Sequence, residues 1–175
     1  MKTHSKLIVV AITAATLFFT TTVKAQTTPV NALRFNIGLE TADPTGNARI
    51  GTTFILGGTA RLQYGISNNF ALTFTSGAYH FFPKYIPGTT TRYGSYGIIP
   101  IKAGIKEFFA KSIYFGAEAG VGIEASDKQT GPTKLLLTPG LGWANQHLDA
   151  GVRYESYTGQ NNNYGLVGLR LAYGF

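Results

Sequence analysis

Apolar and polar residues alternate one by one over much of the chain from residue 33 onward. The segment 33–40 reads Leu-Arg-Phe-Asn-Ile-Gly-Leu-Glu, in which every second residue is apolar. Side chains of a β-strand point alternately to its two faces, so this period of two gives a strand one apolar face. The alternation recurs in eight segments, which we predict to be strands: 33–40, 54–66, 70–80, 96–107, 113–124, 134–143, 148–156 and 164–175.

The connections between these segments alternate in length. Longer stretches lie at 41–53, 81–95, 125–133 and 157–163, and shorter ones at 67–69, 108–112 and 144–147. Alternate connections of an up-and-down antiparallel sheet lie at the same end, so tight turns gather at one end and longer loops at the other. The pattern therefore predicts an all-β fold, an eight-stranded antiparallel up-and-down β-barrel.

The two faces of the strands differ in bulk, which indicates which face lies inside. Glycines and charged residues share the polar face, and the interior of an eight-stranded barrel is only just wide enough for side chains to fill it. The apolar face carries large residues such as Phe74, Phe115, Trp143 and Tyr173, too much volume for that interior. We therefore expect a transmembrane barrel with the apolar face toward lipid, the reverse of a water-soluble barrel.

Charged residues of both signs fall on the predicted inner face. A charge removed from water requires a partner, so we expect these side chains to form a paired network that fills the lumen. The predicted network consists of Arg34, Arg61, Lys102, Lys106, Arg153 and Arg170 with Glu40, Glu118, Glu124, Asp149 and Glu155.

Four residues fit the alternation poorly. Pro100 and Pro139 lie inside predicted strands, although proline lacks the N–H that a closed sheet uses. Leu136 and Tyr114 fall on the polar side. Bulges or shifts of register would explain such exceptions.

Aromatic residues concentrate toward the strand ends, as expected for girdles at the two membrane interfaces. One predicted girdle, near the short turns, holds Tyr64, Phe70, Phe108, Phe109, Tyr114, Phe115, Trp143, Tyr173 and Phe175. The other, near the longer connections, holds Phe54, Tyr79, Phe81, Phe82, Tyr93, Tyr96, Tyr154, Tyr157 and Tyr164.

The composition agrees with a lipid-facing surface. Charged residues make up 13% of the 175 residues, about half the usual share in globular proteins. The 44% hydrophobic content excludes a disordered chain, and the absence of cysteine excludes a disulfide scaffold or a cysteine-ligated metal site. The low charge is what a surface in contact with lipid requires.

Residues 1–25 have the features of a secretory signal peptide. Lys2 and Lys6 precede an apolar run over 7–19, and the small residues of Val-Lys-Ala at 23–25 are typical of a cleavage site. We expect residues 26–175 to form a single barrel domain that is exported through the periplasm. Removal of the leader takes three lysines away, so the net charge falls from +7 to +4. No basic run remains, and we expect no binding to nucleic acid.

The chain ends in a strand that alternates up to a terminal Phe175, with Tyr173 two residues before it. With the leader, the eight strands and the unequal connections, this ending resembles the small eight-stranded bacterial outer-membrane barrels of the OmpA-barrel and OmpX type. The resemblance implies an outer-membrane location and insertion by the barrel-assembly machinery, with Tyr173 and Phe175 as the assembly signal.

The sequence offers little for catalysis. His80 lies at the loop end of a strand, the end at which Ser126 and Asp127 are also expected, and such a trio is a candidate hydrolase or acyltransferase site. Some small outer-membrane barrels modify lipid A, but His147 is followed by Leu148 rather than by the His-x-Ser motif of the deacylases. No metal-ligand spacing appears, and we expect no cofactor and no metal.

The favoured hypothesis is therefore a non-enzymatic outer-membrane barrel with a structural or surface-interaction role. Its partners would be membrane lipids and lipopolysaccharide. Arg49, Lys84 and Arg92 in the loops could contact the anionic lipopolysaccharide head groups, but ordinary solvated loop charges are the favoured interpretation of these three residues. We expect a monomer. A lipid-A-modifying enzyme and a small-solute channel are the alternatives, and the charged lumen argues against the channel.

Overall fold

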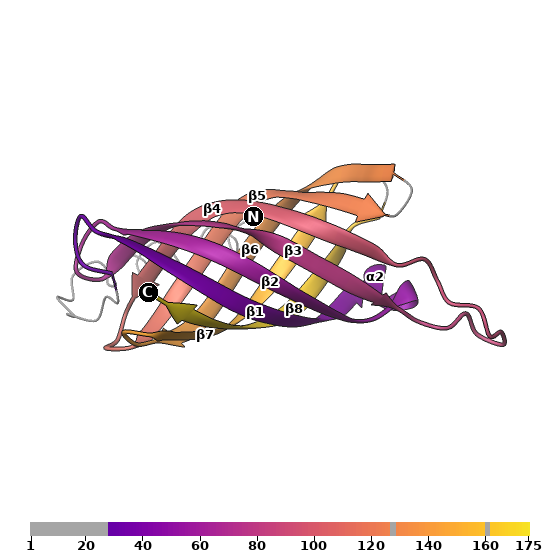
Figure 1. Ribbon diagram of the computed structural model, residues 1–175, viewed down its shortest axis with the longest axis horizontal. Helices are drawn as coiled ribbons and strands as arrows, with labels where there is room; N and C mark the ends of the chain where they lie inside the picture. The colour runs from indigo at the N-terminus through magenta and orange to yellow at the C-terminus, as the bar shows by residue number, and fades with distance from the viewer. Residues whose placement is uncertain (1–27, 127–128, 160–161) are drawn as a thin grey trace, which may run out of the picture.

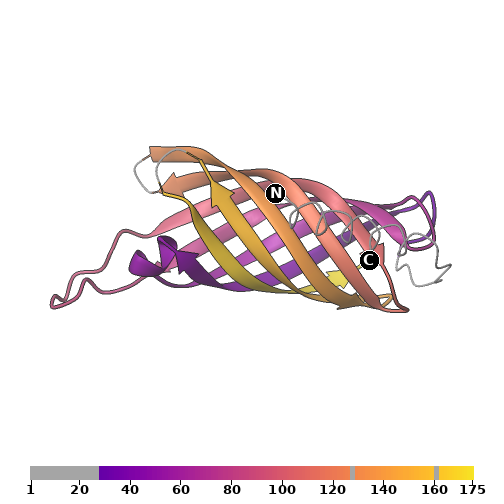
Figure 2. The ribbon, with the colours of Figure 1, turned by 180° about the vertical axis from the view of Figure 1, so that it is seen from behind.

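The computed structural model describes residues 28–126, 129–159 and 162–175. The chain forms a closed barrel in which each strand pairs with the next and β8 pairs antiparallel with β1 (Figures 1 and 2). The strands are β1 Leu33–Gly46, β2 Thr52–Gly65, β3 Phe70–Pro83, β4 Tyr96–Phe108, β5 Ile113–Ser126, β6 Gln129–Ala144, β7 Leu148–Thr158 and β8 Tyr164–Gly174. The prediction of an all-β, eight-stranded, up-and-down barrel is confirmed.

The strands are longer than predicted at one end of the barrel. Of the connections predicted there, 41–53 and 125–133 are wrong, because β1, β2, β5 and β6 continue through most of them. Residues 47–51, which include the short helix α2 (Ala48–Gly51), join β1 to β2. Residues 84–95 form a long hairpin beyond the barrel (Figure 1). Strand ends that project past the bilayer need no apolar outer face, so alternation does not reveal them. We call this the loop end.

The opposite end carries the tight turns 66–69, 109–112 and 145–147 together with Phe175. We call it the turn end. The turn at 145–147 is held by the Asn145 side chain, whose Oδ1 accepts the N–H groups of His147 and Leu148. The connections at the loop end are therefore still longer than those at the turn end, as predicted. Most of this difference in length comes from the hairpin 84–95.

Both unexpected prolines lie where the ladder of hydrogen-bonded pairs is interrupted on one side. The β3–β4 pairing omits Ile99 and Pro100, and the β6–β7 pairing omits Thr138 and Pro139. The register is the same before and after each gap, so neither is a bulge. The missing proline N–H groups thus coincide with missing pairs, while pairing to β5 continues on the other side.

The outside of the barrel is apolar. On the seam between β1 and β8, Leu39 and Leu171 pair directly and are 70% and 60% exposed, and Leu169 beside them is 57% exposed. Water-soluble monomers rarely expose large contiguous apolar surfaces. The outward face is therefore built for contact with lipid. Among the described residues, no helix is both long and apolar enough to cross a membrane.

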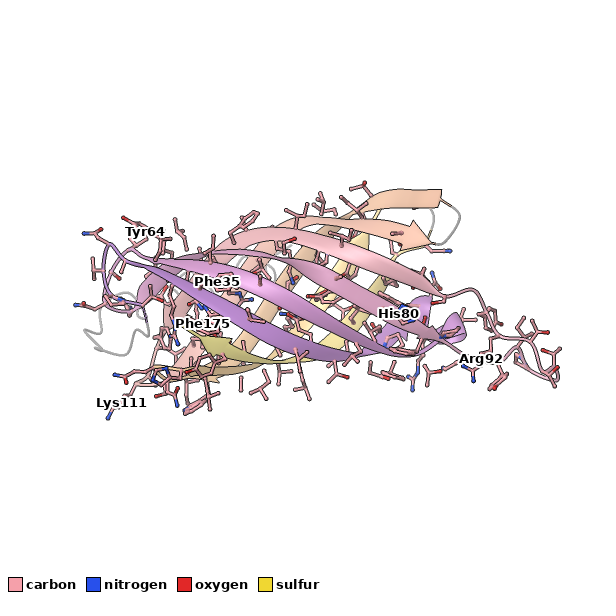
Figure 3. All side chains as sticks on the ribbon, in the orientation of Figure 1. Phe35, Tyr64, His80, Arg92, Lys111 and Phe175 are labelled. Atoms are coloured by element: carbon pink, nitrogen blue, oxygen red, sulfur yellow. The ribbon has the colours of Figure 1, made fainter. Side chains whose placement is uncertain are left out.

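The C-terminal residue closes the seam at the turn end. The Phe175 N–H donates to the carbonyl of Phe35 at 2.9 Å, and the two rings stack with 6.2 Å between their centroids. Figure 3 shows both side chains at the same end of the barrel as Tyr64. The assembly role of Tyr173 and Phe175 stays a prediction. The predicted signal peptide, residues 1–25, lies outside the described residues.

Candidate functional site: the barrel lumen

The structure places the predicted charged residues inside the barrel. Ten of the eleven are buried, and the side chain of Glu124, at the loop end, is 19% exposed. Lys134, which alternation in β6 also directs inward but which the sequence analysis missed, is buried beside Glu124 with 3.9 Å between Nζ and Oε1. The buried positions are Arg34, Glu40, Arg61, Lys102, Lys106, Glu118, Asp149, Arg153, Glu155 and Arg170.

Glu118 is the centre of one group of contacts. Its carboxylate accepts hydrogen bonds from Arg61 Nη2 at 3.0 Å and from Thr75 Oγ1 at 2.6 Å. Lys102 Nζ lies 3.8 Å from Glu118 and donates to Glu155 at 2.6 Å. Because these residues come from β2, β3, β4, β5 and β7, the group joins opposite walls of the barrel.

Glu40 is the centre of a second group, nearer the loop end. Its carboxylate accepts hydrogen bonds from Thr59 Oγ1 at 2.5 Å and from the Tyr79 hydroxyl at 2.8 Å. It also pairs with Arg153 and with Arg170, whose Nε lies 3.3 Å from Oε1. One carboxylate therefore serves two guanidinium groups.

A third group lies toward the turn end. Lys106 Nζ donates to Asp149 at 2.5 Å, and the Tyr114 hydroxyl donates to the other carboxylate oxygen at 2.6 Å. The Lys106 ammonium lies 3.9 Å from the centre of the Tyr114 ring, within the range of a cation–π contact. Beyond them, Arg34 donates to the carbonyls of Asn145 and Gln146 in the turn.

Aromatic and aliphatic side chains close the lumen above and below the charges. This corrects the predicted girdles, because several of their members face inward. The loop-end cluster contains Ala48, Ile55, Tyr79, Phe81, Ile98, Leu136, Tyr157, Tyr164 and Leu166, and the turn-end cluster contains Phe108, Tyr114 and Ala144. Leu136 and Tyr114, unexpected on the polar side, belong to these closures and need no shift of register.

Glycines make room for three of the inward tyrosines. An added Cβ at Gly142 would lie 2.3 Å from the Tyr114 ring, and one at Gly122 would lie 2.7 Å from the ring of Tyr157. At Gly57 the corresponding distance to the Tyr79 ring is 2.2 Å. These contacts were missed because alternation gives the face of a residue but not the residues of other strands that it meets inside the barrel.

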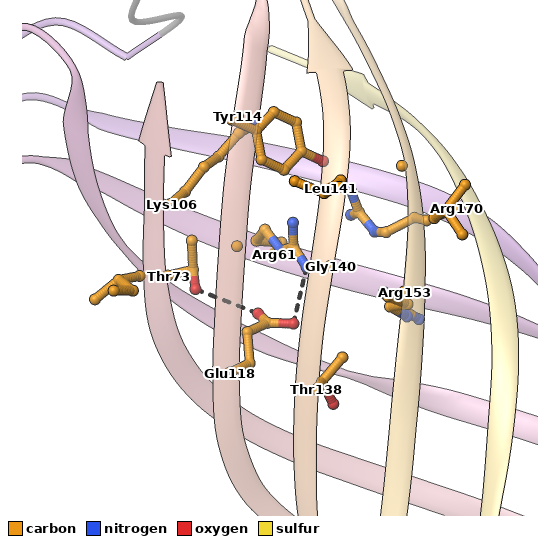
Figure 4. Close-up of a pocket in the computed structure, with 14 residues that line it drawn as sticks. Arg61, Thr73, Lys106, Tyr114, Glu118, Thr138, Gly140, Leu141, Arg153 and Arg170 are labelled. Carbon is orange, nitrogen blue, oxygen red and sulfur yellow. Dashed lines mark hydrogen bonds and ion pairs between the residues drawn. The ribbon is translucent and has the colours of Figure 1, made fainter. Parts of the chain in front are cut away.

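The space left in the middle of the lumen is small, whereas a wider pocket of about 240 Å³ lies at the loop-end mouth beside Glu124 and Lys134. A cavity of about 30 Å³ lies among Arg61, Lys106, Tyr114, Arg153 and Arg170 (Figure 4). A second cavity, beside Glu40 and Tyr79, measures about 10 Å³. Such volumes hold one or a few water molecules. The lumen is therefore filled by side chains rather than arranged as a wide pore.

The candidate catalytic residues do not form a recognisable site among the described residues. His80 faces outward and its Nε2 lies 3.2 Å from Ser95 Oγ, while its ring packs edge-on against Phe82. Asp127 lies outside the described residues, and β4 separates the strand of His80 from that of Ser126.

The second histidine, His147, lies at the other end of the barrel from His80. The ring of His147 stacks on that of Tyr173 at the turn end, with 5.7 Å between their centroids. Within the residues that the structure describes, no group of three or more His, Cys, Asp or Glu residues is placed to hold a metal ion.

The hairpin 84–95 is the other feature of the molecule that carries polar and charged side chains suited to binding. Its two arms meet in a bridge between Tyr85 and Arg92, where the guanidinium carbon lies 4.4 Å from the ring centre and Nη2 donates to the hydroxyl at 2.8 Å. Lys84 Nζ donates to the carbonyl of Arg49 at 2.8 Å and so joins the hairpin to α2. The predicted basic loop residues therefore lie at one end of the barrel, opposite to Lys111 (Figure 3).

Comparison with known proteins identifies the fold. No protein-family model matches the sequence, and no curated protein matches it. The attachment invasion locus protein Ail of Yersinia pestis aligns over 82% of this chain and 97% of its own, with a TM-score of 0.57 and 15% identity. Neisserial surface protein A covers the same shares with a TM-score of 0.54 and 17% identity. A de novo designed transmembrane β-barrel aligns over 84% of this chain and 98% of its own, with a TM-score of 0.50 and 15% identity. The chain has the fold of the small eight-stranded outer-membrane β-barrels.

Proposed function

We propose that the protein is a non-conducting, non-enzymatic barrel of the bacterial outer membrane, whose role is structural or lies in contacts made at its loop end. The observation that carries this proposal is the combination of an apolar exterior and a lumen that side chains close at both ends. In a closed barrel every strand has a hydrogen-bonding neighbour on both sides, so its backbone groups find partners within the sheet. This permits the barrel to span a bilayer. Bacterial barrels of this kind have short periplasmic turns and longer external loops, so the loop end would face outward.

The hairpin 84–95 is the part best placed to meet a partner. It extends beyond the barrel in both ribbon views, and Arg49, Lys84 and Arg92 give this end a positive charge (Figures 1 and 2). Positive charge attracts anionic surfaces over a Debye length of about 8 Å at physiological salt. We infer that the hairpin contacts the phosphate groups of lipopolysaccharide around the barrel. During biogenesis the chain would be a client of the barrel-assembly machinery, and the finished barrel would be a monomer.

Two measurements test membrane insertion and the absence of catalysis. A folded barrel should remain in the membrane fraction and migrate differently on a gel before and after boiling, whereas full solubility without detergent would refute the proposal. Mass spectrometry of lipid A should show no change on expression of the protein. A new lipid-A species that disappears in a His80→Ala variant would establish the enzymatic alternative instead.

A third measurement tests the contact with lipopolysaccharide. The protein is reconstituted in vesicles with and without lipopolysaccharide, and protease cleavage within 84–95 is timed. Lipopolysaccharide should slow the cleavage, and Arg92→Gln should reduce this protection. Lys111→Gln, at the opposite end, is the matched control and should leave protection unchanged. Equal cleavage in both kinds of vesicle would contradict the proposed contact.

A further inference from the structure

We propose that the cavity among Arg61, Arg153 and Arg170 binds one small inorganic anion, a halide such as chloride, enclosed within the barrel. The site lies in the membrane-spanning part of the lumen and is separate from the loop-end contacts proposed above. Three independent observations lead to it: unpartnered guanidinium nitrogens, an excess of buried positive charge, and a cavity of matching size.

The guanidinium group of Arg170 lacks partners at both terminal nitrogens. Its side chain is 3% exposed, and Nη1 and Nη2 have no hydrogen-bond partner in the structure, although Nε donates to Thr59 at 3.2 Å. Nη1 of Arg153 and the hydroxyl of Thr138 are also buried without a partner, and both residues line the same cavity. Buried polar groups are satisfied in the great majority of proteins, so these donors indicate an acceptor in the cavity.

The charges around the cavity do not balance. Four cationic side chains line it, from Arg61, Lys106, Arg153 and Arg170, against the single carboxylate of Glu118. The carboxylates nearby are already engaged: Asp149 is bonded to Lys106, Glu40 is shared by Arg153 and Arg170, and Glu155 is shared by Lys102 and Arg153. Arg170 has no carboxylate of its own. Two guanidinium groups that share one carboxylate keep buried positive charge without a full counter-ion, which is costly, and a bound anion would lower that cost more than a water molecule would.

Positive charges also outnumber negative charges in the lumen as a whole. Within the described residues the lumen carries seven cationic side chains against five carboxylates, counting the half-buried Glu124 and its partner Lys134. Figure 4 shows the Arg170 side chain directed from β8 toward the middle of the lumen, where Arg61 also projects. A negative ion between these two guanidinium groups would stabilise both.

The size of the cavity selects among anions. A volume of about 30 Å³ accommodates roughly two water molecules or one monatomic ion. It is too small for gluconate or another organic anion. Because aromatic side chains close both ends of the lumen, exchange through the finished barrel would be slow. The ion would therefore be enclosed as the barrel forms, and a test must supply it during refolding.

The direct test uses bromide, a halide that scatters X-rays anomalously. The full chain is unfolded in urea, refolded into detergent in sodium bromide without chloride, and crystallised. We expect an anomalous peak in the cavity beside the terminal nitrogens of Arg170. Density without an anomalous signal would show that water alone occupies the cavity and would overturn the proposal.

A solution measurement separates the specific site from general salt effects. Urea midpoints are measured for protein refolded in sodium bromide and in sodium gluconate at equal concentration, for the wild type and for Arg170→Gln. The gain in midpoint from bromide should be larger in the wild type than in Arg170→Gln, and Lys111→Gln, at the exposed turn end, should behave as the wild type. An equal gain in all three proteins would refute the site. If Arg170→Gln does not fold, the bromide map of the wild type decides alone.

Discussion

The Glu118 carboxylate on β5 accepts a hydrogen bond from the Arg61 guanidinium on β2, with 3.0 Å between Oε2 and Nη2. The two strands are not neighbours in the sheet, so this ion pair crosses the lumen. Removal of one partner leaves the other charged and buried. Glu118→Ala should therefore lower the free energy of unfolding by about 3 kcal/mol.

Trp143 reports on this prediction, because it is the only tryptophan of the chain and its side chain faces outward. Urea unfolding of the protein in lipid vesicles, followed by Trp143 fluorescence, gives the free energy. Asp43→Ala, an exposed carboxylate on β1, is the control and should change stability by less than about 0.5 kcal/mol. A loss for Glu118→Ala no greater than that of the control would contradict the account of the network.

Alternation shows why so much of this fold is predictable from the sequence. In a barrel, each residue of a strand faces either the lumen or the lipid, so hydropathy alone assigns Arg61 and Glu118 inward and Leu169 outward. The loop-end extensions of β1, β5 and β6 escaped prediction because residues beyond the bilayer meet water on their outer face. The individual ion pairs could not be predicted either, since they depend on the register of strands distant in the sequence.

The pairing of Gly142 with Tyr114 gives a prediction about packing. An added Cβ at Gly142 would overlap the Tyr114 ring, so Gly142→Ala should cost about 1–3 kcal/mol of stability. In a Tyr114→Ala background the same substitution should cost much less, because the ring is gone. Gly94, where an added Cβ meets nothing within 4 Å, provides the control. Additive losses in the Gly142 and Tyr114 double variant would contradict this contact.

The closed lumen predicts the electrical behaviour of the protein. Recordings in planar bilayers should show no steady open conductance for the wild type. Alanine at both Tyr114 and Tyr157 removes one ring from each closed end and should increase the frequency of small conductance events, because water then reaches the charged centre from both sides. A stable open channel in the wild type would contradict the filled lumen.

Deletion of the terminal residue, Phe175, distinguishes a role in assembly in the cell from a role in the stability of the folded barrel. If Phe175 is part of an assembly signal, its deletion should reduce the amount of barrel in the membrane of cells severalfold. Refolding of the same variant from urea into detergent micelles should succeed, with a small loss from the Phe35 stacking contact. Failure in both settings would show that Phe175 acts through stability alone, and equal yield in cells would show that it is not needed for assembly.

The central claim is that successive residues of each strand face lipid and lumen in turn, and one measurement tests it most directly. The chain contains no cysteine, so single cysteines at Val167, Leu169 and Leu171 on β8 can each carry a spin label in reconstituted bilayers. A label at Ile50, in α2 at the loop end, serves as the water-exposed reference. The account predicts that oxygen, which dissolves in lipid, relaxes the three β8 labels more strongly than a water-soluble nickel complex does, with the opposite order at Ile50. Stronger relaxation of the β8 labels by the nickel complex would contradict a lipid-facing exterior and the membrane barrel with it.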